Sequence, residues 1–294
     1  MKKIRLNKNQ IEVLKIIQSF RYIPMKVLMK IVFEREVYGH LSGLSRGLHR
    51  LEYSGLIKSF LYGNNWKVVF ITKKGAESLA LESGIPIKDI SIPNLSHKVG
   101  FATLEHTVKI ANLYLELAME IPAFPDFSLI EWLGDQQVFL QYKFRSVRNG
   151  KTIKRNLAPD SFFLLQKDGV NKPYFLEYDT GTMDREQLVQ KFLRYFEYFV
   201  YGEWREKFGT FPSILFLTER KEQSMQKYLQ EPEIPLEKAL ALRSKFSDSS
   251  NIVWKAIGMS ENIKSINSKE IYDFLKTQII FNYTNQSWTK ELLK

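Results

Sequence analysis

Two short apolar segments next to carboxylates constrain the fold of this chain more than any other feature. Phe162–Leu165 follows Pro159 and Asp160, and the turn residues Lys167-Asp168-Gly169 separate it from Tyr174–Tyr178. Short apolar runs bounded by turn-forming residues favour two neighbouring strands. Because side chains alternate along a strand, the acids at positions 177 and 179 are expected on one face, opposite Tyr178.

These carboxylates predict a cation site. Acids gathered on one face repel one another unless a hard cation lies between them. We therefore expect Asp160, Glu177 and Asp179 to bind Mg²⁺ or Mn²⁺, and Lys191, one helix later, to complete the catalytic group. Several metal-dependent nucleases are assembled in this way. The alternative is that the acids lie at a strand end facing water.

The positive charge of the chain is concentrated near the N-terminus. The 294 residues have a formal net charge of +11; residues 1–84 carry 15 Lys and Arg against 6 Asp and Glu, whereas the rest carry 28 against 26. A short segment that holds most of the positive charge is typical of a nucleic-acid-binding domain. The alternative is a solvated surface with a chance bias toward basic residues. The absence of cysteine and of a membrane-length apolar run favours a cytoplasmic protein without membrane contact.

The pattern of residues 1–83 predicts a winged helix-turn-helix domain. Helices are expected from Asn7 or Asn9 to Phe20, from Pro24 onward, over 38–53 and over 72–83, with strands at 57–62 and 66–71. Gly63-Asn64-Asn65 has the composition of a tight hairpin between these strands. The third helix would enter the major groove of DNA.

A leucine stripe at 41, 44, 48 and 51 indicates which side of the third helix faces the core. The side left to contact DNA comprises His40, Ser42, Ser45, Arg46, His49 and Arg50. In the hairpin, Asn64, Asn65 and Lys67 are expected to reach the adjacent backbone or minor groove. Since winged helices also dimerise, a homodimer interface is the alternative use of this domain.

Beyond a Pro-containing linker, the pattern indicates an α/β sandwich around a small mixed sheet. A helix is expected at 101–120, strands at 127–133 and 138–147, the two acid-bearing strands, a helix at 186–201 and a strand at 213–218. Further elements are expected at 224–229, 236–244, 252–256 and 269–279. The predicted division is 1–83, linker 84–98, a second domain at 99–258 and a C-terminal helical tail at 259–294.

This arrangement resembles two known groups of proteins. The αβββαβ order with Pro-Asp, Glu-x-Asp and a helix lysine resembles the PD-(D/E)xK nuclease superfamily. The winged helix followed by Pro159-Asp-Ser-Phe-Phe, Phe175-Leu-Glu-Tyr-Asp-Thr-Gly-Thr182 and Lys191-Phe-Leu-Arg-Tyr195 resembles, over residues 5–220, the replication-relaxation family of bacterial plasmids and integrative elements. Where the superfamily usually has its lysine this chain has Asp179, and Lys191 is the candidate replacement.

The resemblance implies an α+β protein with a winged helix and a PD-(D/E)xK nuclease-like domain containing a central mixed sheet. Its implied activity is metal-dependent nicking or relaxation of double-stranded DNA at an origin or nick site, alongside replication or conjugation proteins. Two rivals stay open: a non-catalytic initiator or regulator that uses the nuclease fold as a DNA-binding or assembly platform, and a dimeric endonuclease that cuts both strands.

Accessory roles are expected for a few further residues. Lys154 and Arg155 precede the acid strand and are predicted to hold phosphate, with a solvated loop as the alternative. His106 lies beside the apolar face of its helix, so a satisfied buried histidine is the default and contact with the site the alternative. The aromatic residues of helix 186–201 are expected to fill the core; a nucleophilic tyrosine at 195 or 198 is disfavoured because no His-x-His cluster accompanies it.

Overall fold

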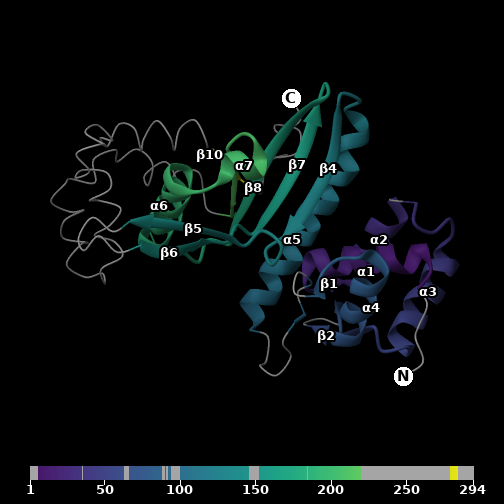
Figure 1. Cartoon of the computed structure of the whole chain (residues 1–294). Helices are drawn as coiled ribbons and strands as arrows, with labels where there is room; N and C mark the ends of the chain where they lie inside the picture. The colour runs from purple at the N-terminus through teal and green to yellow at the C-terminus, as the bar shows by residue number, and fades with distance from the viewer. Residues whose placement is uncertain are drawn as a thin grey trace. The chain divides into compact units, whose positions relative to one another are not determined.

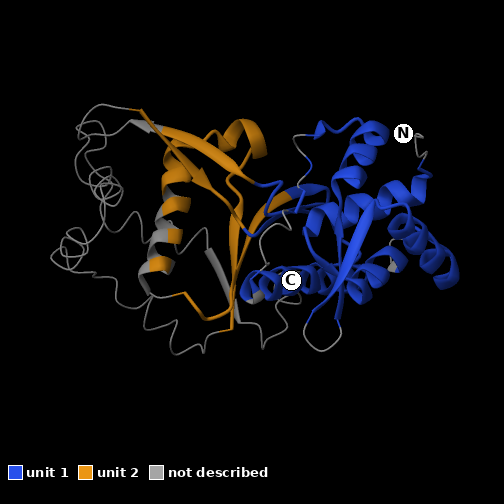
Figure 2. Cartoon of the chain, turned by 90° about the horizontal axis from the view of Figure 1, so that it is seen from below, with its two compact units in different colours: residues 1–138, 160–171, 289–294 blue, residues 139–159, 172–288 orange. Residues whose placement is uncertain are grey.

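The structure, a computed structural model, describes residues 6–34, 36–62, 66–87, 90, 92–93, 100–145, 152–183, 185–219 and 279–283. The elements predicted at 224–229, 236–244 and 252–256, and all but the last residue of 269–279, lie outside these ranges. Two compact units are present (Figure 2): residues 1–138, 160–171 and 289–294 form unit 1, and residues 139–159 and 172–288 form unit 2.

Apart from β1, which was not predicted, the N-terminal elements of unit 1 follow the predicted order. They are α1 (Lys8–Phe20), β1 (Ile23–Pro24), α2 (Met25–Glu34), α3 (Leu41–Tyr53), β2 (Ile57–Tyr62), β3 (Trp66–Ile71) and α4 (Lys73–Ser83) (Figure 1). The strands form an antiparallel sheet in the order β1-β3-β2. Pro24 pairs with Val68 in β1, and α2 begins one residue later. We call residues 6–83 the N-terminal module.

Local sequence signals explain where these helices begin and end. Asn7 and Gln10 form a reciprocal capping box at the start of α1, and the Thr72 hydroxyl accepts the Gly75 N–H at the start of α4. Gly84 ends α4 with a φ of 71°, a conformation that glycine adopts without steric cost. The capping residue of the first predicted helix is therefore Asn7.

An apolar stripe holds α3 against the rest of the module. Leu44, Leu48 and Leu51 are buried as predicted, but Leu41 is 57% exposed, so its assignment to the core stripe is wrong. Leu41 is the first residue of α3, where it extends beyond the surface that the helix buries.

The N-terminal module shares an aromatic core with the later elements of unit 1. These are α5 (Phe101–Glu120), a 3-10 turn (Ile121–Ala123), β4 (Phe127–Gly134) and β7 (Ser161–Lys167), with β4 antiparallel to β7. Phe20 of α1 meets Tyr114 at 5.2 Å between ring centroids, Tyr114 meets Trp132 at 5.1 Å, and Trp132 stacks on Phe163 at 5.5 Å. The module thus packs on α5 and β4 within unit 1, and the linker predicted at residues 84–98 stays a prediction.

Unit 2 contains β5 (Leu140–Arg145), β6 (Thr152–Leu157), most of β8 (Val170–Asp179), α6 (Arg185–Tyr201), α7 (Trp204–Phe208), β9 (Ser213–Thr218) and β10 (Ile279–Tyr283). Strands β5 and β6 form a separate antiparallel hairpin, and β6 was not predicted. The β9 strand runs parallel to β8 and to β10.

The larger sheet has the strand order β10-β9-β8-β7-β4 and mixed direction, so a mixed sheet in an α+β chain is confirmed. Within the ranges that the structure describes, no helix is both long and apolar enough to cross a membrane.

Candidate functional site

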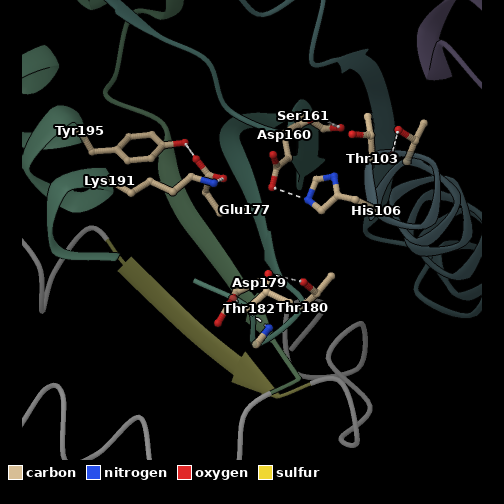
Figure 3. Close-up of polar contacts among 12 residues, drawn as sticks. Thr103, His106, Asp160, Ser161, Glu177, Asp179, Thr180, Thr182, Lys191 and Tyr195 are labelled. Carbon is tan, nitrogen blue, oxygen red and sulfur yellow. Dashed lines mark hydrogen bonds and ion pairs between the residues drawn. The ribbon is translucent and has the colours of Figure 1, made fainter. Parts of the chain in front are cut away.

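Glu177 lies fully buried in β8 and contacts two side chains of α6. The Tyr195 hydroxyl donates a hydrogen bond of 2.5 Å to Oε1, and the Lys191 ammonium forms an ion pair with Oε2 (Figure 3). Lys191 and Tyr195 are one helical turn apart, which places both on the same side of α6. The predicted association of Glu177 with Lys191 is present, whereas its partner Tyr195 was not anticipated.

The ion pair accounts for how a carboxylate can stay charged inside this unit. An isolated buried charge is very costly, and a close ion pair with an added hydrogen bond offsets that cost. The Lys191 side chain is 23% exposed, whereas Glu177 is inaccessible. Lys191 therefore lies between the buried carboxylate and the surface of unit 2.

Asp179, the last residue of β8, is buried and closes the turn that follows. Its Oδ1 accepts the Gly181 N–H at 2.9 Å, and its Oδ2 accepts the Thr218 hydroxyl at 2.9 Å. Thr218 is the register partner of Asp179 on β9, so the parallel pairing brings the two together. Gly181 has a φ of 83°, as a tight turn requires. These contacts favour a structural role, and metal ligation by Asp179 stays a prediction.

Asp160, immediately before β7 in unit 1, is paired with His106 of α5. The His106 Nε2 lies 3.2 Å from Asp160 Oδ2, with 31% and 17% of the two side chains exposed (Figure 3). The default interpretation of His106 as a buried histidine is therefore wrong, because the side chain is partly exposed and contacts a candidate site residue. The neighbouring Glu105 pairs with Lys109 at 3.2 Å.

The chemistry of the donors bears on the predicted cation. Carboxylate oxygens suit Mg²⁺ or Mn²⁺, and Asp160 in unit 1 and Glu177 in unit 2 carry them. The chain itself uses both oxygens of Asp179, and Tyr195 and Lys191 contact both oxygens of Glu177. In the described part of the chain, no three His, Asp or Glu side chains group together in a way that would hold a metal ion. Binding of Mg²⁺ or Mn²⁺ by Asp160 and by Glu177 therefore stays a prediction.

Lys154 and Arg155 lie on strand β6 rather than in a loop. Neighbouring residues of a strand point to opposite faces. Lys154 is exposed, while Arg155 is half-buried and interacts electrostatically with Glu197. The side chains of Lys154 and Arg155, predicted to act together, therefore lie on opposite faces of β6.

A buried polar pair that sequence reasoning missed connects the hairpin to α6. The Tyr142 hydroxyl of β5 donates a hydrogen bond to Glu197 Oε2. Burial raises the pKa of Glu197 and that of Tyr142, and the carboxyl raises the pKa of Tyr142 further. Tyr195 and Tyr198 are also buried, and burial raises the pKa of Tyr198 to about 12. Both tyrosines belong to the core, as expected.

The predicted DNA-facing side of α3 is exposed. The exposed residues there are His40, Ser42, Ser45, Arg46, His49 and Arg50. Arg46 donates a hydrogen bond to the Ser42 carbonyl at 3.3 Å, and His49 stacks on Tyr53 with 6.4 Å between ring centroids. Lys67 is exposed but pairs with Glu52 at 2.9 Å, and Asn64 and Asn65 lie outside the described residues.

Fold and site together define a mixed α+β protein: N-terminal helices with a small antiparallel sheet precede a mixed sheet with a buried Glu–Lys pair. The family model described as Replication-relaxation matches residues 14–214, well over half of the chain. The chain belongs to the replication-relaxation family, as its sequence motifs indicated. No curated protein and no solved structure matched it.

Proposed function

We propose that this replication-relaxation protein binds double-stranded DNA through its N-terminal module, with α3 in the major groove as in a winged helix. The observation that carries the proposal is the two-sided character of α3. Leu44, Leu48 and Leu51 are buried on one side, and the other side exposes hydroxyls, histidines, Arg46 and Arg50. These are the side-chain types that contact base edges and phosphates.

Charge on α3 supports a polyanionic partner. The only acid in α3 is Glu52, and it accepts hydrogen bonds from both Ser59 and Lys67. The carboxylate of α3 itself is therefore already engaged by Ser59 and Lys67. Because Lys67 is held by Glu52, we assign direct contact to α3 first and to the β2–β3 hairpin second.

The test is the affinity of the full chain for labelled duplex DNA, measured by fluorescence anisotropy. Arg46→Ala and Arg50→Ala should each weaken binding by about 5-fold to 150-fold, the loss expected for an arginine that contacts a base. Lys172→Ala removes the same charge from an exposed position on β8 and serves as the control. Equal affinity of all variants and wild type would refute the assignment of α3.

A second candidate is the metal-dependent nicking predicted from the sequence, and the contact of Lys191 with Glu177 favours it. The predicted cation, Mg²⁺ or Mn²⁺, would polarise a phosphate and lower the pKa of a bound water. Lys191 would neutralise charge that develops on the phosphate, and Tyr195 would orient the Glu177 carboxylate.

Nicking is tested with supercoiled plasmid and Mn²⁺, comparing wild type with Asp160→Asn and Glu177→Gln. Both substitutions remove one charge and preserve shape, so loss of nicking in both would support catalysis. Plasmid that stays closed with the wild type would favour the rival, a non-catalytic platform. That rival is supported by the engagement of both Glu177 oxygens and both Asp179 oxygens by the chain itself.

A further inference from the structure

The hairpin formed by β5 and β6 carries a second concentration of positive charge. Residues 139–159 contain six Lys and Arg and no Asp or Glu. Residues 85–294 carry 28 basic against 26 acidic side chains, so outside this segment that part has 22 against 26. The positive charge of the C-terminal part therefore comes from this short segment.

The strand register places like charges opposite each other on one face. Lys143 pairs with Lys154, and two residues along, Gln141 pairs with Asn156, whose side chains are hydrogen-bonded at 3.3 Å. All four side chains are exposed. Directly opposite residues have Cβ atoms about 5 Å apart, and like charges at that distance destabilise a sheet. An anion bound across the two lysines would relieve this repulsion.

The opposite face of the hairpin is held by α6. In Figure 1, the ribbon of α6 lies beside β5 and β6. Tyr142 donates a hydrogen bond to Glu197 and packs edge-on against the ring of Tyr198, with 5.8 Å between ring centroids, and the half-buried Arg155 interacts electrostatically with Glu197. A two-stranded hairpin alone is marginally stable, and packing on a helix supplies what it lacks. The hairpin therefore has one anchored face and one exposed, basic face.

We propose that the exposed face of the β5–β6 hairpin, defined by Gln141, Lys143, Thr152, Lys154 and Asn156, binds the phosphate backbone of duplex DNA. This rests on the proposed function, because it adds a contact in unit 2 to the α3 contact in unit 1. Lysine, amide and hydroxyl side chains are the types that position a protein on phosphates. A two-stranded ribbon is also among the elements that the major groove admits.

The experiment measures how duplex affinity of the full chain depends on salt. Each lysine–phosphate contact contributes about 0.9 to the slope of log affinity against log salt. Lys143→Gln/Lys154→Gln should therefore reduce that slope by about 1.8. The matched control, Lys172→Gln/Lys207→Gln, removes two exposed charges from unit 2 outside the hairpin and should leave it unchanged. Lys143→Arg/Lys154→Arg keeps both charges and should therefore have the same salt slope as wild type.

The outcomes separate the two proposals. The hairpin assignment is overturned if the salt slope of Lys143→Gln/Lys154→Gln equals that of the control pair. In that case the α3 assignment still stands if Arg46→Ala weakens binding. An equal loss of slope in the control pair also overturns it, because the effect would then be one of net charge. If the wild-type chain shows no salt-dependent duplex binding, both proposals fail.

Discussion

Removing the ammonium of Lys191 should leave Glu177 as an uncompensated buried charge. Lys191→Met keeps most of the side-chain volume and removes the charge, while Glu177 stays inaccessible with only the Tyr195 hydrogen bond. Breaking a buried pair from one side costs about 3 to 5 kcal/mol. Because Lys191 is 23% exposed and water screens it in part, we expect the lower end, about 3 kcal/mol of unfolding free energy.

Removing both charges together should restore most of the lost stability. In Glu177→Gln/Lys191→Met neither charge remains, and the amide oxygen can still accept the Tyr195 hydrogen bond. Replacing a buried pair by neutral groups of similar volume is often close to neutral, so stability should return to within about 1 kcal/mol of wild type. This recovery distinguishes an unpaired charge from a packing defect.

Urea unfolding followed by far-ultraviolet circular dichroism supplies the measurement. Lys172→Met, an exposed lysine on the same strand as Glu177, is the control and should change stability by less than about 0.5 kcal/mol. Lys191→Met as stable as this control would show that Glu177 is not left as a costly buried charge. A double variant no more stable than Lys191→Met would show that the loss comes from packing instead of charge.

Two further predictions concern the cores of the two units. Burial raises the pKa of Glu197 above its ordinary value of 4.5. Between these two pKa values the folded chain keeps a proton that the unfolded chain releases. The free energy of unfolding therefore falls as the pH rises above 4.5, until the pKa of the folded state is passed. Glu197→Gln should flatten that fall and be the more stable form at neutral pH in urea titrations; an unchanged pH profile would contradict this. Phe20→Ala should cost about 3 to 5 kcal/mol because Phe20 fills the aromatic core of unit 1. The exposed Phe33→Ala is its control, and similar midpoints for the two would count against a shared core.

The elements with strong periodicity could be predicted from the sequence. The helix at 101–120 and the strand at 213–218 have the predicted bounds, and the strand carrying Glu177 was recognised from its apolar run. Strand β6, Thr152–Leu157, was missed because its sequence, Thr-Ile-Lys-Arg-Asn-Leu, is mostly polar. β6 is stabilised by pairing with β5 and by the packing of one face on α6. Neither contact can be predicted from the local pattern of polar and apolar residues.

The site was predictable in its residue types and less so in its contacts. Glu177 and Lys191 meet as expected, but Tyr195 and Thr218, which are 18 and 39 residues from the acids they bind, complete the arrangement through tertiary packing. Helical periodicity indicated a face for His106 without identifying Asp160 as its partner. Periodicity gives the direction of a side chain, and the partner depends on which elements the fold brings together.

Site-specific cross-linking can determine whether α3 faces bound DNA. The chain has no cysteine, so Ser45→Cys on α3 creates a single position for a thiol-reactive photo-cross-linker. Glu77→Cys, exposed on α4, is the matched control. If α3 faces DNA, labelled duplex DNA should cross-link to the full chain from position 45 and much less from position 77. Cross-linking from position 77 with none from position 45 would contradict this expectation.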